Sequence, residues 1–280
     1  MNKLSTAKKV AVISALVEGC SVRSTSRMTG VAKGTILRLL AEVGTACAMF
    51  QDKTLRNLSA QRVQCDEIWS FCYAKKKNVT AEIAEKNPAA GDVWTWTAMD
   101  ADSKLMVSWL VGSRDLPTAT VFMQDVASRL ANRVQLTTDA FKAYLTAVDR
   151  AFGIDIDYAI LQKIYASEGT GRYSPAICLG CTKDEVCGSP DSKHISTSYI
   201  ERQNLTMRMN MRRFTRLTNA FSKKIDNHIH SVALFYMHYN FARVHQTLRV
   251  TPAMEAGIAR HVWSIQEIVE LADAACSIAA

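Results

Sequence analysis

The 280-residue chain lacks the long apolar runs of a membrane protein. Apolar stretches such as Val232–Tyr236 are far shorter than the roughly 20 residues that a membrane-spanning helix needs. No apolar segment follows Lys3, so the start of the sequence does not resemble a secretory signal. The eight cysteines are too sparse for a scaffold built on disulfides. These absences predict a cytoplasmic protein with no membrane partner and with reduced cysteines.

The shares of apolar and charged residues are ordinary, whereas the net charge is high. Hydrophobic residues make up 48% of the chain and charged residues 21%, which is typical of a folded globular protein. A length of 280 residues predicts one large domain or two unequal ones. The formal net charge of +8 predicts a polyanionic partner.

The positive charge is concentrated in two blocks. Residues 1–60 contain nine Lys or Arg and three acidic residues, and residues 201–249 contain nine and two. The rest of the chain is net negative, so most of the acidic residues lie between the two basic blocks. We interpret this pattern as a protein that holds a polyanion and brings metal to it. The alternative is that both blocks are solvated helix faces without a partner.

The first basic block has the pattern of three helices. Residues 5–18 predict the first helix, Ser21 caps a short second helix that ends near Gly30, and Lys33 begins the third. The apolar stripe of the third helix consists of Ile36, Leu39, Leu40 and Val43. This pattern is typical of a helix-turn-helix module, although plain packing units share it. The side chains expected to contact the major groove of DNA are Lys33, Thr35 and Arg38.

The middle of the chain predicts an α/β fold. Aromatic and β-branched residues mark three strands in succession, after which helices and further strands alternate. The expected order is β-β-β-α-β-α-β followed by a long helix. The expected elements are Val63–Tyr73, Asp92–Met99, Leu105–Val111, Ala119–Leu130, Val134–Thr138, Ala140–Val148 and Ile154–Leu161. This order predicts a mixed sheet with helices on its faces.

Three acidic residues stand out by their positions. Asp66 lies within the first predicted strand, where an acid is costly unless it is paired or bound to metal. Asp139 lies at the carboxyl end of the fourth predicted strand, and ligands of open α/β sheets collect just outside such ends. Glu201 lies on a helix that Ser196 or Ser198 is expected to cap. Taken singly, each has an ordinary explanation, as an exposed strand acid, a helix cap or a helix surface acid.

Four segments carry a resemblance to a known family. They are Cys65–Phe71, Thr137–Tyr144, Ser198–Met209 and Tyr239–Pro252. The first three together resemble bacterial insertion-sequence transposases of the DDE class, and most of all the insertion-sequence-one type. The fourth resembles the segment that closes many integrase-type cores. The resemblance covers about residues 61–260 and implies a ribonuclease-H-like core that cleaves DNA and transfers strands. It also implies that Asp66, Asp139 and Glu201 are the catalytic residues and metal ligands.

The resemblance further implies cofactors and partners. Two Mg²⁺ ions about 3.5–4 Å apart, or Mn²⁺ in their place, activate the nucleophile and neutralise the leaving 3′-oxygen. Acids crowded into one site repel one another, so the site is expected to be poorly formed without metal. The expected partner is double-stranded DNA, both element ends and target, bound by a homodimer or a higher homo-oligomer in the bacterial nucleoid.

The spacing of the acids agrees with this organisation. The interval between Asp66 and Asp139 leaves room for a meander, a helix and a return strand. The interval between Asp139 and Glu201 is longer than one strand and a connection require, so we expect an insertion at about residues 162–194. The neighbouring Glu67 matches no motif position and is expected to matter little. The expected domains are a helix-turn-helix domain at 1–50, a linker at 51–60, the catalytic core at 61–260 and a C-terminal helix at 261–280.

Basic residues follow Glu201 without compensating acids. No Asp or Glu occurs between residues 202 and 225. The five arginines, expected on the same helix as Glu201, are Arg202, Arg208, Arg212, Arg213 and Arg216. We predict that they contact phosphates that flank the scissile bond. A solvated helix face is the alternative.

Two further groups of residues remain open. Cys178, Cys181, Cys187 and His194 have a spacing near, but not on, common patterns of tetrahedral zinc sites. Thiols in an insertion also occur without metal. Most histidines of the aromatic-rich segment after residue 225, among them His228, are expected to be packing residues.

The sequence therefore favours a two-domain DNA transposase over two alternatives. One alternative is a DNA-binding repressor whose core has lost its activity, which the presence of all three motif carboxylates disfavours. The other is a ribonuclease-H-like nuclease or resolvase that cuts without joining. Nothing in the sequence separates cutting from joining, because strand transfer depends on how the DNA ends are held.

Overall fold

The computed structural model of the chain describes residues 4–165, 177–215 and 219–278. Two compact units are distinguished. Unit 1 consists of Met1–Arg56, Ile68–Thr95 and Gln203–Ala280, and unit 2 consists of Asn57–Glu67 and Trp96–Arg202. None of the helices in the described ranges is both long enough and apolar enough to pass through a lipid bilayer.

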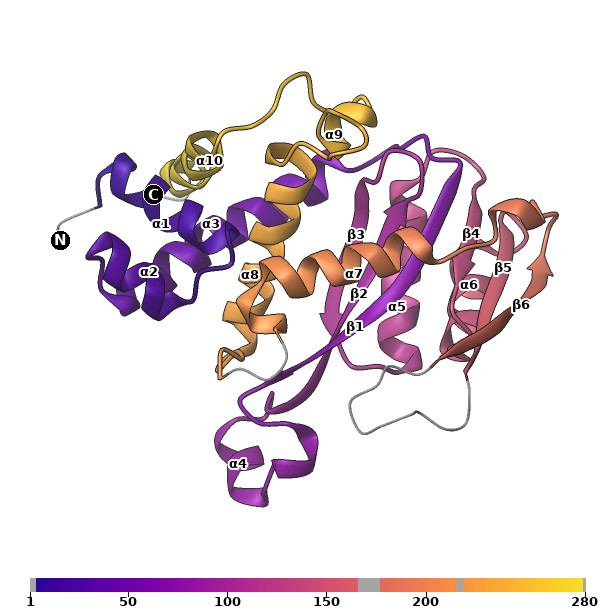
Figure 1. Cartoon of the computed structure of the whole chain (residues 1–280), viewed down its shortest axis with the longest axis horizontal. Helices are drawn as coiled ribbons and strands as arrows, with labels where there is room; N and C mark the ends of the chain where they lie inside the picture. Colours follow the sequence, from indigo (N-terminus) through magenta and orange to yellow (C-terminus); the bar gives the residue numbers. More distant parts are fainter. Residues whose placement is uncertain (1–3, 166–176, 216–218, 279–280) are drawn as a thin grey trace. The chain divides into compact units, whose positions relative to one another are not determined.

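The central element is a six-stranded mixed sheet (Figure 1) with the strand order β3-β2-β1-β4-β5-β6. The strands are β1 (Arg62–Cys72), β2 (Gly91–Asp100), β3 (Met106–Gly112), β4 (Gln135–Thr138), β5 (Asp157–Tyr165) and β6 (Cys178–Cys187). β4 runs parallel to both β1 and β5, whereas β6 is antiparallel to β5. The predicted α/β class with a mixed sheet is confirmed.

The helices around the sheet follow the predicted order. α5 (Leu116–Arg129) connects β3 to β4, α6 (Ala143–Phe152) connects β4 to β5, and α7 (Ser198–Asn210) comes after β6. β6 lies in the segment where the sequence predicts an insertion. Shorter elements are a 3₁₀ turn at Lys76–Asn78, α4 (Ala81–Lys86) and a 3₁₀ turn at Ser192–His194.

The hydrophobic core of unit 2 gathers on the side of the sheet that α5 and α6 cover. The Trp96 ring of β2 lies 5.8 Å from Phe122 of α5 and 5.5 Å from Tyr144 of α6, centroid to centroid. Cys65 of β1 is fully buried in the same cluster. Because side chains alternate along a strand, Asp66 faces the other side of the sheet.

The side of β1 that carries Asp66 receives the first turn of α7. Gln64 Oε1 accepts hydrogen bonds from the backbone N–H groups of Tyr199 and Ile200, at 3.0 and 3.1 Å. Amide groups in the first turn of a helix have no partner within the helix, so these bonds satisfy two of them. The same bonds fix the position of Glu201, which follows in that turn.

Unit 1 contains the N-terminal helices and those that follow α7 (Figure 1). They are α1 (Thr6–Val17), α2 (Val22–Thr29), α3 (Lys33–Thr54), a 3₁₀ turn at Arg212–Phe214, α8 (Ile225–Met237), a π-helical turn at His238–Ala242, α9 (Pro252–Glu255) and α10 (Ile265–Ile278). The Ser21 hydroxyl accepts the Ser24 N–H at 3.0 Å and caps α2, and Gly30 ends it with a φ of 70°. The three N-terminal helices are present as predicted, and their helix-turn-helix role stays a prediction.

α3 is longer than the predicted third helix and packs against α8. A Cβ atom on Gly44 would lie 2.5 Å from His230 Cβ, so glycine permits the close approach of the two helices. Gln51 Nε2 donates a hydrogen bond of 3.0 Å to the carbonyl of Ala233 on α8. The first four residues of the predicted linker, 51–54, are therefore helical, and Gln51 is packed against α8.

His228 is a buried packing residue of α8. Its Nδ1 lies 2.8 Å from Ser222 Oγ and its Nε2 lies 3.4 Å from Ser70 Oγ. Burial, assisted by the charge of Arg213, lowers the pKa of His228 to about 3. The imidazole is therefore neutral in the folded protein at neutral pH.

Acid is expected to destabilise the protein through His228. An unfolded histidine has a pKa of about 6.5, so the unfolded chain takes up a proton before the folded chain does. The contribution of the neutral His228 to the free energy of unfolding is fully present above pH 6.5. It decreases by about 1.4 kcal/mol per pH unit as the pH falls from 6.5 toward 3. Urea unfolding at pH 7.5 and 5.5 measures the loss. Between these two pH values the His228→Gln variant should lose about 1.4 kcal/mol less stability than the wild-type protein. Equal losses in both proteins would contradict this account.

Candidate metal centre

Asp66 lies half-buried in the middle of β1. Its Oδ1 accepts the backbone N–H of Glu67 at 2.8 Å, and its carbonyl accepts the Thr97 hydroxyl at 2.9 Å. The second bond joins β1 to its neighbour β2. These contacts hold the Asp66 backbone and orient the carboxylate.

Asp139 is the first residue after β4, the strand parallel to β1. Its Oδ1 accepts the backbone N–H of Phe141 at 3.0 Å, and the Thr138 hydroxyl donates to its carbonyl at 2.9 Å. The strand end and the turn that follows therefore orient this carboxylate. The position agrees with the rule that ligands of such sheets collect beyond the carboxyl ends of parallel strands.

Glu201 lies in the first turn of α7. Ser196 Oγ, one of the two predicted caps, accepts the Ser198 N–H at 3.2 Å at the start of this helix. The Thr197 hydroxyl donates to Glu201 Oε1 at 2.5 Å, and Lys163 of β5 forms an ion pair with Oε2. The Glu201 charge is therefore compensated by a lysine.

The three carboxylates line one cavity of unit 2. Its volume is about 690 Å³. Basic side chains also line it, namely Arg114, Lys142 and Lys163. Asp66, Asp139 and Glu201 come from a strand, a strand end and a helix, so only the folded chain brings them to one place. Their catalytic role stays a prediction.

Glu67 joins the cluster, although the sequence interpretation sets it aside. Ligand oxygens of Asp66, Glu67 and Asp139 all lie within 4.8 Å of one another. Glu67 is buried on the α5 and α6 side of the sheet, and burial with the nearby charge of Asp139 raises its pKa to about 8. Strand alternation places neighbours on opposite faces, so the sequence gives no signal that both approach Asp139.

Arg114 connects two members of the cluster and is also missed by the sequence interpretation. Its Nε lies 3.1 Å from Glu67 Oε1, and its Nη2 lies 3.6 Å from Asp139 Oδ2. The guanidinium lies 4.0 Å from the centre of the Phe141 ring, which restricts it further. Arg114 thus partly compensates the acids and positions Asp139.

The donor set fits a hard divalent cation. Mg²⁺ takes oxygen ligands at about 2.0–2.1 Å, so oxygens on opposite sides of one ion are about 4 Å apart. The ligand oxygens of Asp66, Glu67 and Asp139 lie within 4.8 Å of one another, which is close to this separation. Glu201 lies outside that group, and its carboxylate is paired with Lys163. Asp66 and Asp139 therefore lie close enough to bind one metal, whereas Glu201 is not among the ligands that the structure brings together.

Mg²⁺ is expected to stabilise the wild-type protein against heat. A ligand that binds only the folded state adds about 2.7 kcal/mol at 100 times its Kd, which is several degrees in Tm for a domain of this size. The shift should vanish in Asp139→Asn. Glu185→Gln, an exposed acid of β6, is the matched control and should keep it. An equal Mg²⁺ shift in all three proteins would place the metal elsewhere.

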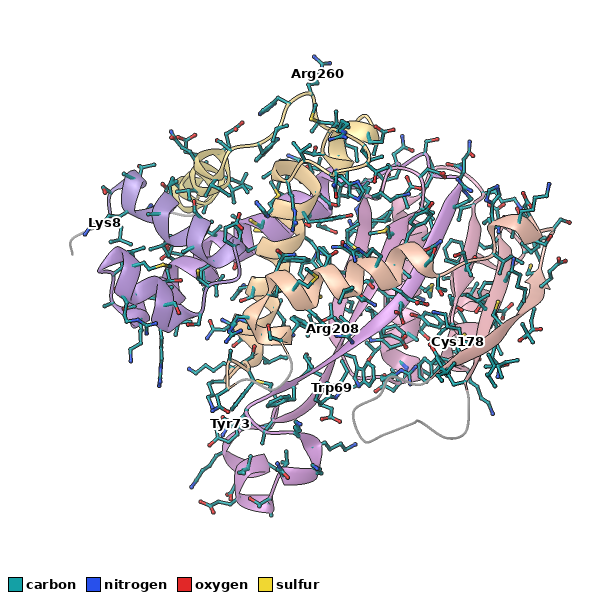
Figure 2. The ribbon with its side chains drawn as sticks, viewed as in Figure 1. Lys8, Trp69, Tyr73, Cys178, Arg208 and Arg260 are labelled. Carbon is teal, nitrogen blue, oxygen red and sulfur yellow. The ribbon has the colours of Figure 1, made fainter. Side chains whose placement is uncertain are left out.

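The predicted DNA-binding residues lie in both units. Lys33 and Arg38 of α3 and Arg202 of α7 are exposed, as is Arg212, whereas Thr35, Arg208 (Figure 2) and Arg213 are half-buried. Arg216 lies outside the described residues. One expectation is wrong, since α7 ends at Asn210 and Arg212 and Arg213 lie in the 3₁₀ turn that follows. The helix stops there because Met211 turns the backbone to an extended conformation, and Met211 and Phe214 are buried.

The described residues do not assemble the possible zinc site. Cys178 (Figure 2), Cys181 and Cys187 lie along β6, and His194 lies in the 3₁₀ turn beyond it. The strand between them separates Cys181 from Cys187 by roughly 20 Å, far more than one tetrahedral ion can span. Within the described ranges, the acidic group at Asp66 is the one cluster of possible metal ligands.

Fold and site together define a mixed α/β protein with a carboxylate cluster formed by the middle of β1 and the carboxyl end of its parallel neighbour β4. No family model matches the chain, and no curated protein matches it. Among solved structures, the chain is similar to piggyBac transposase in a cryo-EM structure of its synaptic complex with hairpin DNA. The two chains are 10% identical with a TM-score of 0.40, and the match covers 95% of this chain and 69% of the other.

Proposed function

We propose that the chain is a DNA transposase of the DDE class with a ribonuclease-H-like core. The observation that carries the proposal is the convergence of Asp66, Asp139 and Glu201 on one cavity. The order and spacing of these acids agree with the insertion-sequence-one resemblance, and the mixed sheet agrees with the implied fold. The two basic sequence blocks support a DNA partner.

The residues of the cavity divide the work of phosphodiester chemistry among them. Asp66 and Asp139 would hold divalent metal, and Glu201 would complete its coordination. Bound Mg²⁺ supplies activation of the attacking hydroxyl group and charge neutralisation at the leaving 3′-oxygen. Arg114 keeps Asp139 in place through its contacts with Glu67 and Phe141. Lys142 and Lys163 line the cavity, where they would attract the phosphodiester.

A cleavage and joining assay tests the proposal. The purified chain is incubated with Mg²⁺, a target plasmid and labelled duplexes that tile the DNA on both sides of its coding sequence. We expect one or two duplexes to be nicked at a defined position and their 3′ ends to be joined to the plasmid. Nicking without joining would favour the nuclease or resolvase, and binding without nicking would favour the repressor. We expect a homodimer or higher oligomer on the cleaved duplex, which light scattering measures.

A further inference from the structure

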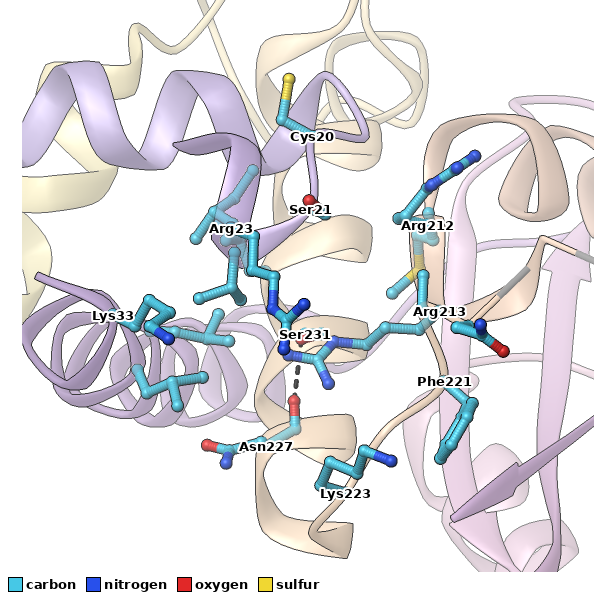
Figure 3. A pocket seen from close by; sticks show the side chains of 18 residues that line it. Cys20, Ser21, Arg23, Lys33, Arg212, Arg213, Phe221, Lys223, Asn227 and Ser231 are labelled. Carbon is cyan, nitrogen blue, oxygen red and sulfur yellow. Dashed lines mark hydrogen bonds between the residues drawn. The ribbon is translucent and has the colours of Figure 1, made fainter. Parts of the chain in front are cut away.

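A cavity in unit 1 gathers basic side chains from both ends of the sequence (Figure 3). Its volume is about 800 Å³, within the roughly 300–1,000 Å³ of ligand sites in proteins. The basic residues that line it are Arg23, Lys33, Arg212, Arg213 and Lys223. Among its described lining residues there is no Asp or Glu. Cations grouped without acids repel one another, so the cavity favours an anionic ligand.

The fold holds these cations on two opposite walls. Arg23 lies in the first turn of α2, and Lys33 is the first residue of α3. Arg213 follows α7 and donates a 3.0 Å hydrogen bond to Ser222 Oγ. Lys223 lies 3.7 Å from the centre of the Phe221 ring. The two basic blocks, which lie far apart in the sequence, therefore meet around one space.

The remaining wall is largely apolar. The apolar residues that line it include Leu16, Leu37, Leu40, Met211, Phe221 and Leu234. A DNA duplex presents phosphates to its partners but keeps the faces of its bases stacked inside. An unpaired nucleotide presents both a phosphate and a base face, and aromatic and cationic side chains bind such nucleotides. A concave wall with both characters therefore matches an unpaired nucleotide better than a duplex backbone.

We propose that this cavity binds an unpaired nucleotide of a DNA strand, with its phosphates held by the basic side chains and its base against the apolar wall. The inference rests on the proposed function for its DNA partner. It goes beyond that function because it assigns Arg23, Lys223 and Phe221 to DNA binding. It also predicts that Lys33 contacts a phosphate group and not the edge of a base. The N-terminal helices and the segment after α7 then form one binding site.

Binding to paired and bulged DNA tests the inference. Fluorescence anisotropy compares a labelled 20-base-pair duplex with the same duplex carrying a central three-nucleotide bulge, both without metal. The full-length wild-type chain is expected to prefer the bulged duplex by roughly 5- to 150-fold, the range that stacking of one base provides. The preference should approach 1 in Phe221→Leu and in the double variant Arg23→Gln, Lys33→Gln. Arg27→Gln, an exposed change on the same helix as Arg23 but outside the cavity wall, should keep it.

Two results would overturn the inference. One is equal wild-type affinity for both duplexes, which would mean that the cavity recognises paired backbone or nothing. The other is a preference for the bulged duplex that persists in the double variant. Both substitutions of that variant are at exposed residues and should leave the fold intact, which thermal unfolding checks. The proposed function fails separately, since its readout is Mg²⁺-dependent cleavage of paired ends. Cleavage without a preference for the bulged duplex would contradict only the inference about the cavity. A preference for the bulged duplex without cleavage would contradict only the proposed transposase function.

Discussion

Asp66→Asn and Asp139→Asn are each expected to reduce Mg²⁺-dependent cleavage and joining by at least about 10³-fold. Each change keeps the size of the side chain and removes one negative charge from the metal ligands. Loss of one preorganised electrostatic group at a reacting centre costs about 10²–10³-fold, and loss of a metal costs more. Quantified gel assays of nicked and joined product, normalised to folded protein, measure the effect. DNA affinity should persist or rise, because repulsion between carboxylate and phosphate decreases.

Two further variants separate catalysis from folding. Asp149→Asn changes an exposed acid of α6 in the same unit and should leave activity within about twofold. Glu67→Gln is no neutral control, because Glu67 holds Arg114 beside Asp139. We expect it to lower activity less than Asp139→Asn does. Full activity in both Asp66→Asn and Asp139→Asn would show that these two carboxylates take no part in catalysis.

DNA affinity is expected to fall by about 10³- to 10⁵-fold between 50 and 200 mM salt. That range corresponds to six to ten neutralised phosphates, and the two basic blocks contain eighteen Lys or Arg to supply them. Arg202→Gln and Arg212→Gln each change an exposed arginine and should each flatten the log–log slope by about 0.9. Arg150→Gln, an exposed arginine of α6, is the control and should leave the slope unchanged. Unchanged slopes in both Arg202→Gln and Arg212→Gln would mean that these two arginines are solvated and contact no phosphate.

The sheet could be predicted because its signals are local. Alternation and β-branched residues mark β1 and β2 close to their observed ends. Serine and glycine punctuate α1 and α2 in the same way. The end of α7 could not be predicted, because it depends on the burial of Met211 and Phe214 in the folded chain, where the Phe214 ring lies 5.0 Å from the His228 ring of α8. Tertiary packing decides that boundary, and the arginines after it leave the helix.

The site could be predicted only where a motif marks it. The sequence pattern predicts the element that carries each motif carboxylate. These elements are a strand for Asp66, a strand end for Asp139 and the start of a helix for Glu201. Glu67 and Arg114 are not, because their pairing depends on how β1 and the segment after β3 come together in the folded sheet. The cavity in unit 1 is a similar case, since no local pattern joins residues 23–33 to residues 212–223.

A metal-rescue experiment on Asp139→Cys tests the central claim most directly. A thiolate is a soft ligand that binds Mg²⁺ poorly and the softer Mn²⁺ better. If Asp139 binds the catalytic metal, the variant should be inactive with Mg²⁺ and should recover cleavage by at least about tenfold with Mn²⁺. The wild-type protein, assayed beside it with both ions, gives the reference. Equal loss with both ions, or full activity with Mg²⁺, would contradict the claim that Asp139 holds the metal that cleaves DNA.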